Sequence, residues 1–359
     1  MKRIIVVLFV ISSILNAQDY DESANWIFFG RQPSAKTESM GRIVALDYDN
    51  NFLSQSNPAS LISSQGISVY YSQSSNLYLV ENFIQYSGGI SYNAGKLGAF
   101  AFNVQLLDWG EFDYASEGSP EVIGTFRSTD ELYTLSYSNN VYNWFSVGVN
   151  ANLLKLLQGP NNSASGSTYF DIGLLRKFNL FDDSVINDCL TIGGQIKNVF
   201  GQEVEIIDIG EESYYETLPI IFNIGISNKI EYFNKSLWER GYLIGLTLGF
   251  EYQGLFNSEY RTAKKFGGEL SVLDVLYFRG GYYYEIPTEN DNCLNCLGYI
   301  ENTTFGFGVN IDFETLFKTD YPLTIKIDYI DIPQPTQVTD FDSWDNFQTI
   351  SLIANYIIK

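Results

Sequence analysis

The chain has 359 residues, enough for one large domain or two modest ones. Its 42 acidic residues outnumber its 21 lysines and arginines, and the formal net charge of −21 argues against electrostatic capture of nucleic acid or of an anionic membrane face. The absence of histidine excludes Ser-His-Asp and Cys-His catalysis and every metal site with a histidine ligand. Aromatic residues reach 16% and charged residues only 18%, a mixture typical of strands and interfacial aromatic rings.

Residues 1–17 have the parts of a secretory signal peptide. A cationic start at Lys2 and Arg3 precedes an apolar run over residues 4–15, and Ala17 offers a cleavage site. An uncleaved membrane anchor is the alternative, but a bilayer-spanning helix needs about 18 apolar residues and this run is shorter. We therefore expect export. Because no later stretch resembles a spanning helix, the mature chain could cross a membrane only as a closed barrel.

Residues 18–65 lack the regular alternation of a strand. They include the apolar run 26–29, which needs apolar neighbours, and the sequence Asn57-Pro58-Ala59-Ser60-Leu61. A barrel of about fourteen strands encloses a lumen too wide for its own side chains to fill. We interpret residues 18–65 as a plug, or hatch, inside such a barrel; a periplasmic tail is the alternative.

Residues 66–359 contain successive segments in which apolar and polar side chains alternate, a pattern that predicts β-strands. In residues 242–253, the apolar side chains from Tyr242 to Tyr252 fall on one face, and Gly, Thr, Glu and Gln fall on the other. This run rises about 34 Å and, tilted by about 40°, projects onto about 25 Å, the height of a lipid-facing band. A soluble sandwich also alternates, but its apolar face would rarely end in aromatic residues at both tips. The sequence therefore predicts an all-β, transmembrane antiparallel barrel.

About fourteen strands are predicted, an even number as in bacterial outer-membrane barrels. They span residues 66–73, 83–93, 96–107, 130–138, 144–155, 167–177, 189–197, 218–229, 242–253, 265–272, 275–285, 303–313, 322–331 and 347–357. Short connections follow even-numbered strands and long polar ones follow strands three, seven, eleven and thirteen, which matches short periplasmic turns and long outer loops. Two even connections, 178–188 and 230–241, are longer than this pattern prefers.

Charged residues on the polar strand faces are predicted to point into the lumen, and they are Glu251, Arg279, Asp312, Lys326 and Asp328. Their mixed signs predict paired charges that hold the wall and the plug together. Catalysis by a carboxylate pair is unsupported, because nothing in the sequence fixes the separation of two acids. We expect no enzymatic activity.

The cysteines and the acid-rich segments are the remaining candidate sites. Cys293 and Cys296 share a long loop, where an oxidising compartment favours a local disulfide; a redox site would need a βαβ setting, and a metal site would need a second pair of ligands. Cys189 is expected to be a single thiol, buried or on the lipid side. Segments 203–216 and 340–345 could hold calcium, but the glycine of an EF-hand loop is missing and a solvated acidic rim is favoured. No metal or cofactor is expected.

Short motifs follow one another along the mature chain: PSAKTESMG at 33–41, NPASL at 57–61, DWGEFD at 108–113, GTF at 124–126, FSVGVN at 145–150, FDIG at 170–173, KNVFG at 197–201 and LP at 218–219. In this order they resemble successive segments of the PorV/PorQ family, relatives of the FadL outer-membrane transporters. The resemblance implies a fourteen-stranded barrel, a luminal hatch containing Asn57, Pro58 and Ala59, and a role in type IX secretion of Bacteroidota. The chain departs from the family in lacking a terminal aromatic residue.

Two functions compete for this predicted barrel in the bacterial outer membrane. The resemblance implies a secretion component that docks exported cargo, or translocon or attachment subunits, through its loops. Loops 108–129 and 198–217 would supply the aromatic anchors Trp109, Phe112, Tyr114, Tyr214 and Tyr215. The alternative is a FadL-like channel for small hydrophobic molecules, gated by the hatch, although the predicted lumen is polar. A soluble exported β-protein is a third hypothesis. Expected partners are outer-membrane lipid with a secretion subunit, a cargo protein or a hydrophobic small molecule, and no nucleic acid.

Overall fold

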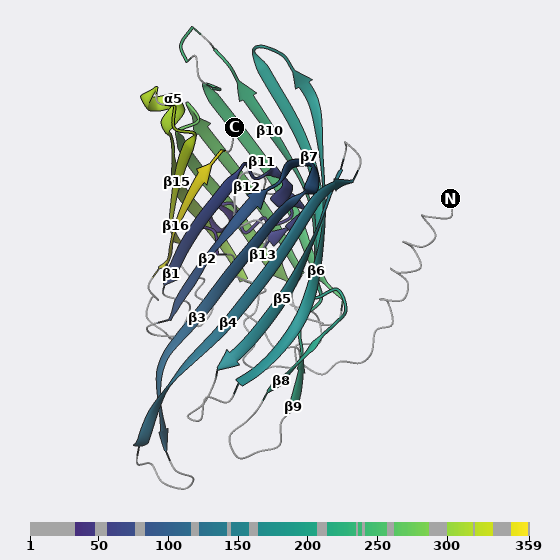
Figure 1. Cartoon of the computed structure of the whole chain (residues 1–359), viewed down its shortest axis with the longest axis vertical. Coiled ribbons are helices and arrows are strands. Elements are labelled where there is room, and N and C mark those ends of the chain that lie inside the picture. Colours follow the sequence, from purple (N-terminus) through teal and green to yellow (C-terminus); the bar gives the residue numbers. More distant parts are fainter. Residues whose placement is uncertain are drawn as a thin grey trace, which may run out of the picture.

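The computed structural model describes residues 33–46, 56–75, 83–115, 122–141, 145–157, 164–206, 214–234, 236–238, 241–256, 262–286, 300–318, 320–332 and 346–357. These residues form a closed antiparallel barrel of fourteen strands, in which β1 pairs with β16 to complete the ring (Figure 1). A separate two-stranded sheet of β8 and β9 stands outside the ring. No helix within the described ranges is long and apolar enough to cross a membrane.

The predicted barrel of fourteen strands is confirmed. The strands of the ring are β1 (Ile67–Ser75), β2 (Ile84–Asn93), β3 (Ala99–Ala115), β4 (Val122–Val141), β5 (Phe145–Leu157), β6 (Ala164–Asp182), β7 (Ile186–Lys197), β10 (Ile221–Tyr232), β11 (Ile244–Leu255), β12 (Thr262–Val272), β13 (Leu276–Ile286), β14 (Ile300–Asp312), β15 (Leu323–Ile332) and β16 (Phe347–Tyr356). The extra strands are β8 (Glu203–Ile206) and β9 (Tyr214–Thr217), which form inside a segment that we expected to be a loop.

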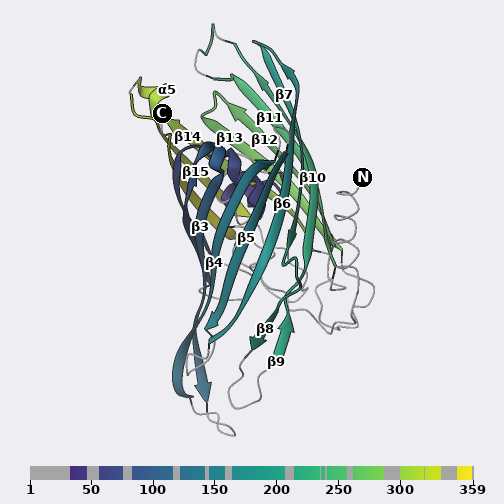
Figure 2. The same cartoon turned by 45° about the vertical axis from the view of Figure 1, so that its right-hand side comes forward.

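The two ends of the barrel differ in their connections. One end, here called the turn end, holds the start of β1, the end of β16 and tight connections such as residues 94–98. The other, the loop end, holds β8, β9 and the long β3–β4 hairpin, which reaches well past the other strands (Figures 1 and 2). Because β6 and β7 extend to Asp182 and Ile186, the connection predicted to be long at 178–188 is in fact a short turn.

The wall turns its apolar side chains outward, as predicted. Leu248 on β11 and Phe305 on β14 are 57% and 61% exposed, whereas Glu251 and Thr304 on the same two strands are completely buried. A continuous apolar exterior is the surface of a barrel that lies in lipid, since soluble proteins rarely expose such patches. Tyr242 is an exception to the predicted lipid-facing row: it precedes the start of β11 and is buried at the turn end.

Part of the chain before β1 lies against the inner face of the wall. This inner segment, residues 33–46 and 56–66, contains α3 (Ala35–Ser39) and the 3₁₀ helix η1 (Pro58–Ser63), drawn in purple within the ring (Figures 1 and 2). The backbone N–H of Ala35 donates to Ser351 Oγ on β16 (2.9 Å), and Ser138 Oγ on β4 donates to the carbonyl of Ala59 (3.1 Å). The signal peptide at 1–17 and the rest of the predicted plug at 18–65 lie outside the described residues, so those boundaries stay predictions.

Candidate functional site

The side chain of Asn57 joins two parts of the inner segment to the wall. Its Oδ1 accepts a hydrogen bond from the backbone N–H of Ala59 (3.0 Å), which caps η1. Its Nδ2 donates to the carbonyl of Ala45 (2.9 Å) and reaches the carbonyls of Leu174 on β6 and Gly194 on β7 at 3.3 and 3.4 Å. The first residue of the predicted hatch motif is therefore buried where the inner segment meets the barrel.

The wall beneath the hatch motif carries glycines instead of side chains. Gly148 on β5 and Gly173 on β6 lie directly opposite each other in the ladder. A Cβ atom would lie 2.2 Å from the carbonyl carbon of Pro58 if added to Gly148, and 2.0 Å from Asn57 Oδ1 if added to Gly173. Only glycine permits the inner segment to approach the wall this closely. Both glycines belong to motifs of the PorV/PorQ resemblance, FSVGVN and FDIG, but the sequence did not indicate that they lie against the hatch motif.

Glu251 on β11 binds the main chain of the inner segment. Its Oε2 accepts hydrogen bonds from the backbone N–H groups of Val44 (2.7 Å) and Ala45 (2.6 Å), and its Oε1 accepts from Lys265 Nζ on β12 (2.8 Å). Hydrogen bonds to a charged group are among the stronger ones in proteins, particularly away from water. This wall carboxylate therefore holds the inner segment in place.

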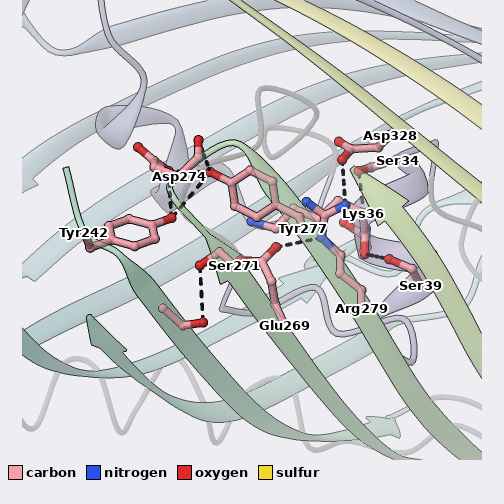
Figure 3. Close-up of polar contacts among 12 residues, drawn as sticks. Ser34, Lys36, Ser39, Tyr242, Glu269, Ser271, Asp274, Tyr277, Arg279 and Asp328 are labelled. Carbon is pink, nitrogen blue, oxygen red and sulfur yellow. Dashed lines mark hydrogen bonds and ion pairs between the residues drawn. The ribbon is translucent and has the colours of Figure 1, made fainter. Parts of the chain in front are cut away.

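A second buried charge network includes Arg279 on β13, as Figure 3 shows. Arg279 donates from Nε to Glu269 Oε2 on β12 and from Nη1 to Asp328 Oδ1 on β15, both at 2.6 Å. Lys36 of α3 lies beside these residues (Figure 3). The network thus joins three strands of the wall close to α3.

Of the five charges predicted to face the lumen, the structure buries Glu251, Arg279 and Asp328 on the inner face. Lys326 on β15 and Asp312 are half-buried near the turn end. Asp312 ends β14 and caps the short helix α5 (Phe313–Phe317), which replaces the last residue of the strand predicted at 303–313. The reason is local, because an Asp side chain that accepts from the next backbone N–H groups favours a helix start over a continued strand.

A cluster of hydroxyl groups and one carboxylate lies at the turn end (Figure 3). Leu273 and Asp274 join β12 to β13 with φ values of 58° and 56°, the left-handed conformation required by a tight hairpin turn. The hydroxyl groups of Tyr242 and Tyr277 both donate to Asp274 Oδ1, the first over 2.7 Å. Burial, followed by the charge of Asp274, raises the pKa of Tyr242 above its ordinary value.

The predicted anchors of loop 108–129 lie on strands, because β3 runs to residue 115 and β4 begins at residue 122. Trp109 is not an exposed anchor: its ring packs edge-on against Phe83 (5.1 Å between centroids), and its Nε1 donates to Asp130 Oδ2 (2.7 Å). Phe112 is 41% exposed and stacks on Phe126 at 5.7 Å. Tyr114 is a strand residue whose side chain is outside the described part of the structure.

The remaining predicted residues are only partly described. Tyr215 on β9 is exposed, and Tyr214 belongs to the same strand. Cys293, Cys296 and the acidic segment 340–345 lie outside the described residues. Cys189 is a free, half-buried thiol in the inward register of β7, and not on the lipid side. Within the described ranges, no group of three or more cysteines, aspartates or glutamates is placed to hold a metal ion.

A small cavity, here called the gate cavity, separates the inner segment from β10, β11 and β12. It measures about 40 Å³ and has Met40, Ile43 and Leu46 on the side of the inner segment. Ser227, Thr247 and Gly249 line it from the wall, and the charged residues Lys36, Lys229 and Glu269 also belong to its lining. The sequence predicted a polar lumen and did not indicate this apolar patch.

No family model matches the chain, and no curated protein matches it. Several solved structures are similar over most of their length. The Pseudomonas putida toluene transporter TodX is 13% identical, with 95% of this chain and 99% of that chain covered and a TM-score of 0.41. The Ralstonia pickettii toluene transporter TbuX is 11% identical, with 92% and 100% covered and a TM-score of 0.46. A Pseudomonas aeruginosa FadL homologue is 12% identical, with 91% and 98% covered and a TM-score of 0.45. Similarity at such low identities and TM-scores does not establish the function of this chain. The PorV/PorQ resemblance stays an expectation.

Proposed function

We propose that this chain is an outer-membrane channel for a small hydrophobic molecule, with the inner segment as its gate. The observation that carries the proposal is the gate cavity, where Met40, Ile43 and Leu46 of the inner segment face the wall. Small-molecule sites are lined mainly by apolar side chains with a few polar groups, and such a lining suits an apolar ligand. The apolar exterior supports a location in lipid, and no cofactor is required.

The gate cavity is closed to such a ligand in this conformation. An aromatic ring needs roughly 150 Å³, and the cavity measures about 40 Å³. Passage therefore requires the inner segment to move away from β11. Met40 is suited to such a change because its flexible thioether side chain can repack around different shapes. The hydrogen bonds that Val44 and Ala45 donate to Glu251 would have to open.

The experiment is uptake of radiolabelled toluene, the compound of the toluene transporters TodX and TbuX. Host cells without a hydrocarbon channel of their own would produce the chain or a variant. Thr247→Phe fills the gate cavity from the wall and should reduce uptake about tenfold, while Thr168→Phe adds the same ring to the exposed face of β6. Uptake equal in cells with and without the chain would refute the proposal, as would equal loss in both variants.

Protein docking through the loop end is a second candidate function. The observation that favours it is the stacked pair Phe112 and Phe126, on a hairpin that projects past the ring and also exposes Val122 and Ile123. Exposed apolar clusters of this kind often mark contact sites for proteins. Docking of type IX secretion cargo or subunits would be the finer form, and it depends on the PorV/PorQ resemblance alone.

Affinity purification from the native host separates the two functions. Replacing Phe112 and Phe126 together by alanine should remove a docked partner, while Phe181→Ala, at the exposed turn end, should not. If the double variant retains every protein that purifies with the parent chain, the docking function is wrong. Toluene uptake by the double variant should stay unchanged, because no residue of the hairpin lines the gate cavity.

A further inference from the structure

A large cavity opens at the turn end of the barrel and has no role in the proposed gate. It measures about 300 Å³, within the range of small-molecule sites. Ser64 enters it from the inner segment, and Tyr242, Asp274 and Asn310 enter it from the wall. We call it the turn-end cavity. Its lining is predominantly polar, in contrast to the gate cavity.

The charged groups around the turn-end cavity already have partners. Asp274 accepts from the hydroxyl groups of Tyr242 and Tyr277. Lys229 forms an ion pair with Glu231 (2.8 Å). Asp312 accepts from the backbone of α5, and Lys326 also interacts with other groups. An ionic ligand would therefore have to compete with existing pairs.

Two neutral side chains of the lining, unlike the charged ones, each have an oxygen without a partner. Ser64 and Asn310 are 8% and 6% exposed, and neither Ser64 Oγ nor Asn310 Oδ1 has a hydrogen-bond partner among the described residues. The amide nitrogen of Asn310 donates to the carbonyl of Asp274 (3.0 Å), which fixes the side chain with its oxygen left over. Other buried atoms of this kind occur in the structure, such as Ser91 Oγ, but of those described Ser64 and Asn310 are the two that also line the turn-end cavity, where a ligand could satisfy them. Both oxygens are covered at rest, so a ligand reaches Ser64 Oγ after a rotation of that side chain and reaches Asn310 Oδ1 when the bond to Asp274 opens.

We propose that the turn-end cavity binds a small, neutral molecule rich in hydroxyl groups, of the size of a monosaccharide. A ligand hydroxyl can donate to Asn310 Oδ1, and a second can either donate to or accept from Ser64 Oγ. The volume of the cavity admits a ring with several such groups. The inference does not depend on the proposed channel function: Lys229 borders both cavities, but Ser64 and Asn310 line only the turn-end cavity.

The experiment is titration calorimetry of the full-length protein in detergent with glucose. Ser64→Ala removes a hydroxyl that has no described partner, so folding should not suffer, and it should weaken glucose binding by about 3- to 10-fold. Asn310→Leu should weaken binding at least as much. The matched control is Ser91→Ala, which removes another buried, unpartnered hydroxyl, on β2 and away from the cavity, and should leave the affinity unchanged.

The charge of the ligand is tested with gluconate and glucosamine. Glucose should bind more tightly than both, because the ionic groups of the cavity are already engaged. The proposal is overturned if glucose shows no saturable binding up to about 50 mM, if Ser64→Ala and the parent bind it equally, or if either charged analogue binds more tightly. Toluene uptake is measured separately, so failure of one proposal is distinguishable from failure of the other.

Discussion

The Oε2 atom of Glu251 lies 2.6 Å from the backbone nitrogen of Ala45, 206 residues away in the chain. The same oxygen accepts from the backbone of Val44, and Lys265 balances the charge of the carboxylate. The wall thus recognises the main chain of the inner segment rather than a side chain. Any movement of the inner segment must break this contact between a buried carboxylate and two N–H donors.

Replacing Glu251 by glutamine should loosen the inner segment. The amide keeps the shape and one acceptor oxygen, but it leaves Lys265 without its anionic partner, and loss of one member of a buried pair typically costs about 3–5 kcal/mol. We expect larger or more frequent ion-conducting openings in planar bilayers. Glu231→Gln, in a less buried pair at the turn end, is the matched control. Indistinguishable current traces for the two variants would contradict the role assigned to Glu251.

A methyl group at Gly173 should displace the hatch motif. Its Cβ would lie 2.0 Å from Asn57 Oδ1, so Gly173→Ala must move η1 or distort β6. We expect a loss of stability of about 1–3 kcal/mol, as for overpacking in cores. It should appear as a lower unfolding temperature in heat-modifiable gel migration. At Gly280, on β13, the nearest atom to an added Cβ is 3.8 Å away, and Gly280→Ala should be neutral. Equal stability of both variants would place η1 elsewhere.

The lipid-facing assignment predicts a penalty that depends on position. Leu248→Arg puts a charge in the middle of β11 and should reduce folding into lipid vesicles by about 2–4 kcal/mol. Leu97→Arg, in the exposed turn between β2 and β3, should fold like the parent. Folded fractions can be compared by gel shift after dilution from urea. A Leu248→Arg variant that folds fully, and better in buffer than in vesicles, would favour the soluble hypothesis.

Tyr242 predicts a weakening of the turn end at high pH. Its pKa is raised in the folded state, so its neutral form stabilises the fold below the ordinary tyrosine pKa of about 10, and this contribution is lost as the pH rises above it. Tyr242→Phe lacks the ionisable group, although it also loses the bond to Asp274. Between about pH 10 and pH 11, the parent should therefore lose about 1 kcal/mol more than the variant. Urea unfolding in vesicles measures both; parallel pH profiles would exclude this contribution.

The sequence alone predicted the barrel, because alternation is a local property with a period of two residues. Leu248 and Glu251 could be assigned to opposite faces from their positions in one strand. The number of strands followed from counting such runs. The ends of the strands were predicted less well. The predicted third strand ends at residue 107, whereas β3 continues past Asp108 because Gly110, with φ at 87°, accommodates a register shift. The sequence of an isolated segment does not reveal whether a strand continues through such a shift.

The tertiary structure decided which of these residues meet. Inward-facing charges were predicted as a set, but the contact of Glu251 with Val44 and Ala45 depends on how the ring closes and where the inner segment lies within it. The same holds for Gly173 beneath Asn57 and for Trp109, which is packed against Phe83 instead of being exposed. Side-chain periodicity specifies a face within each strand, whereas contacts between distant segments depend on register and closure, and no local pattern encodes these.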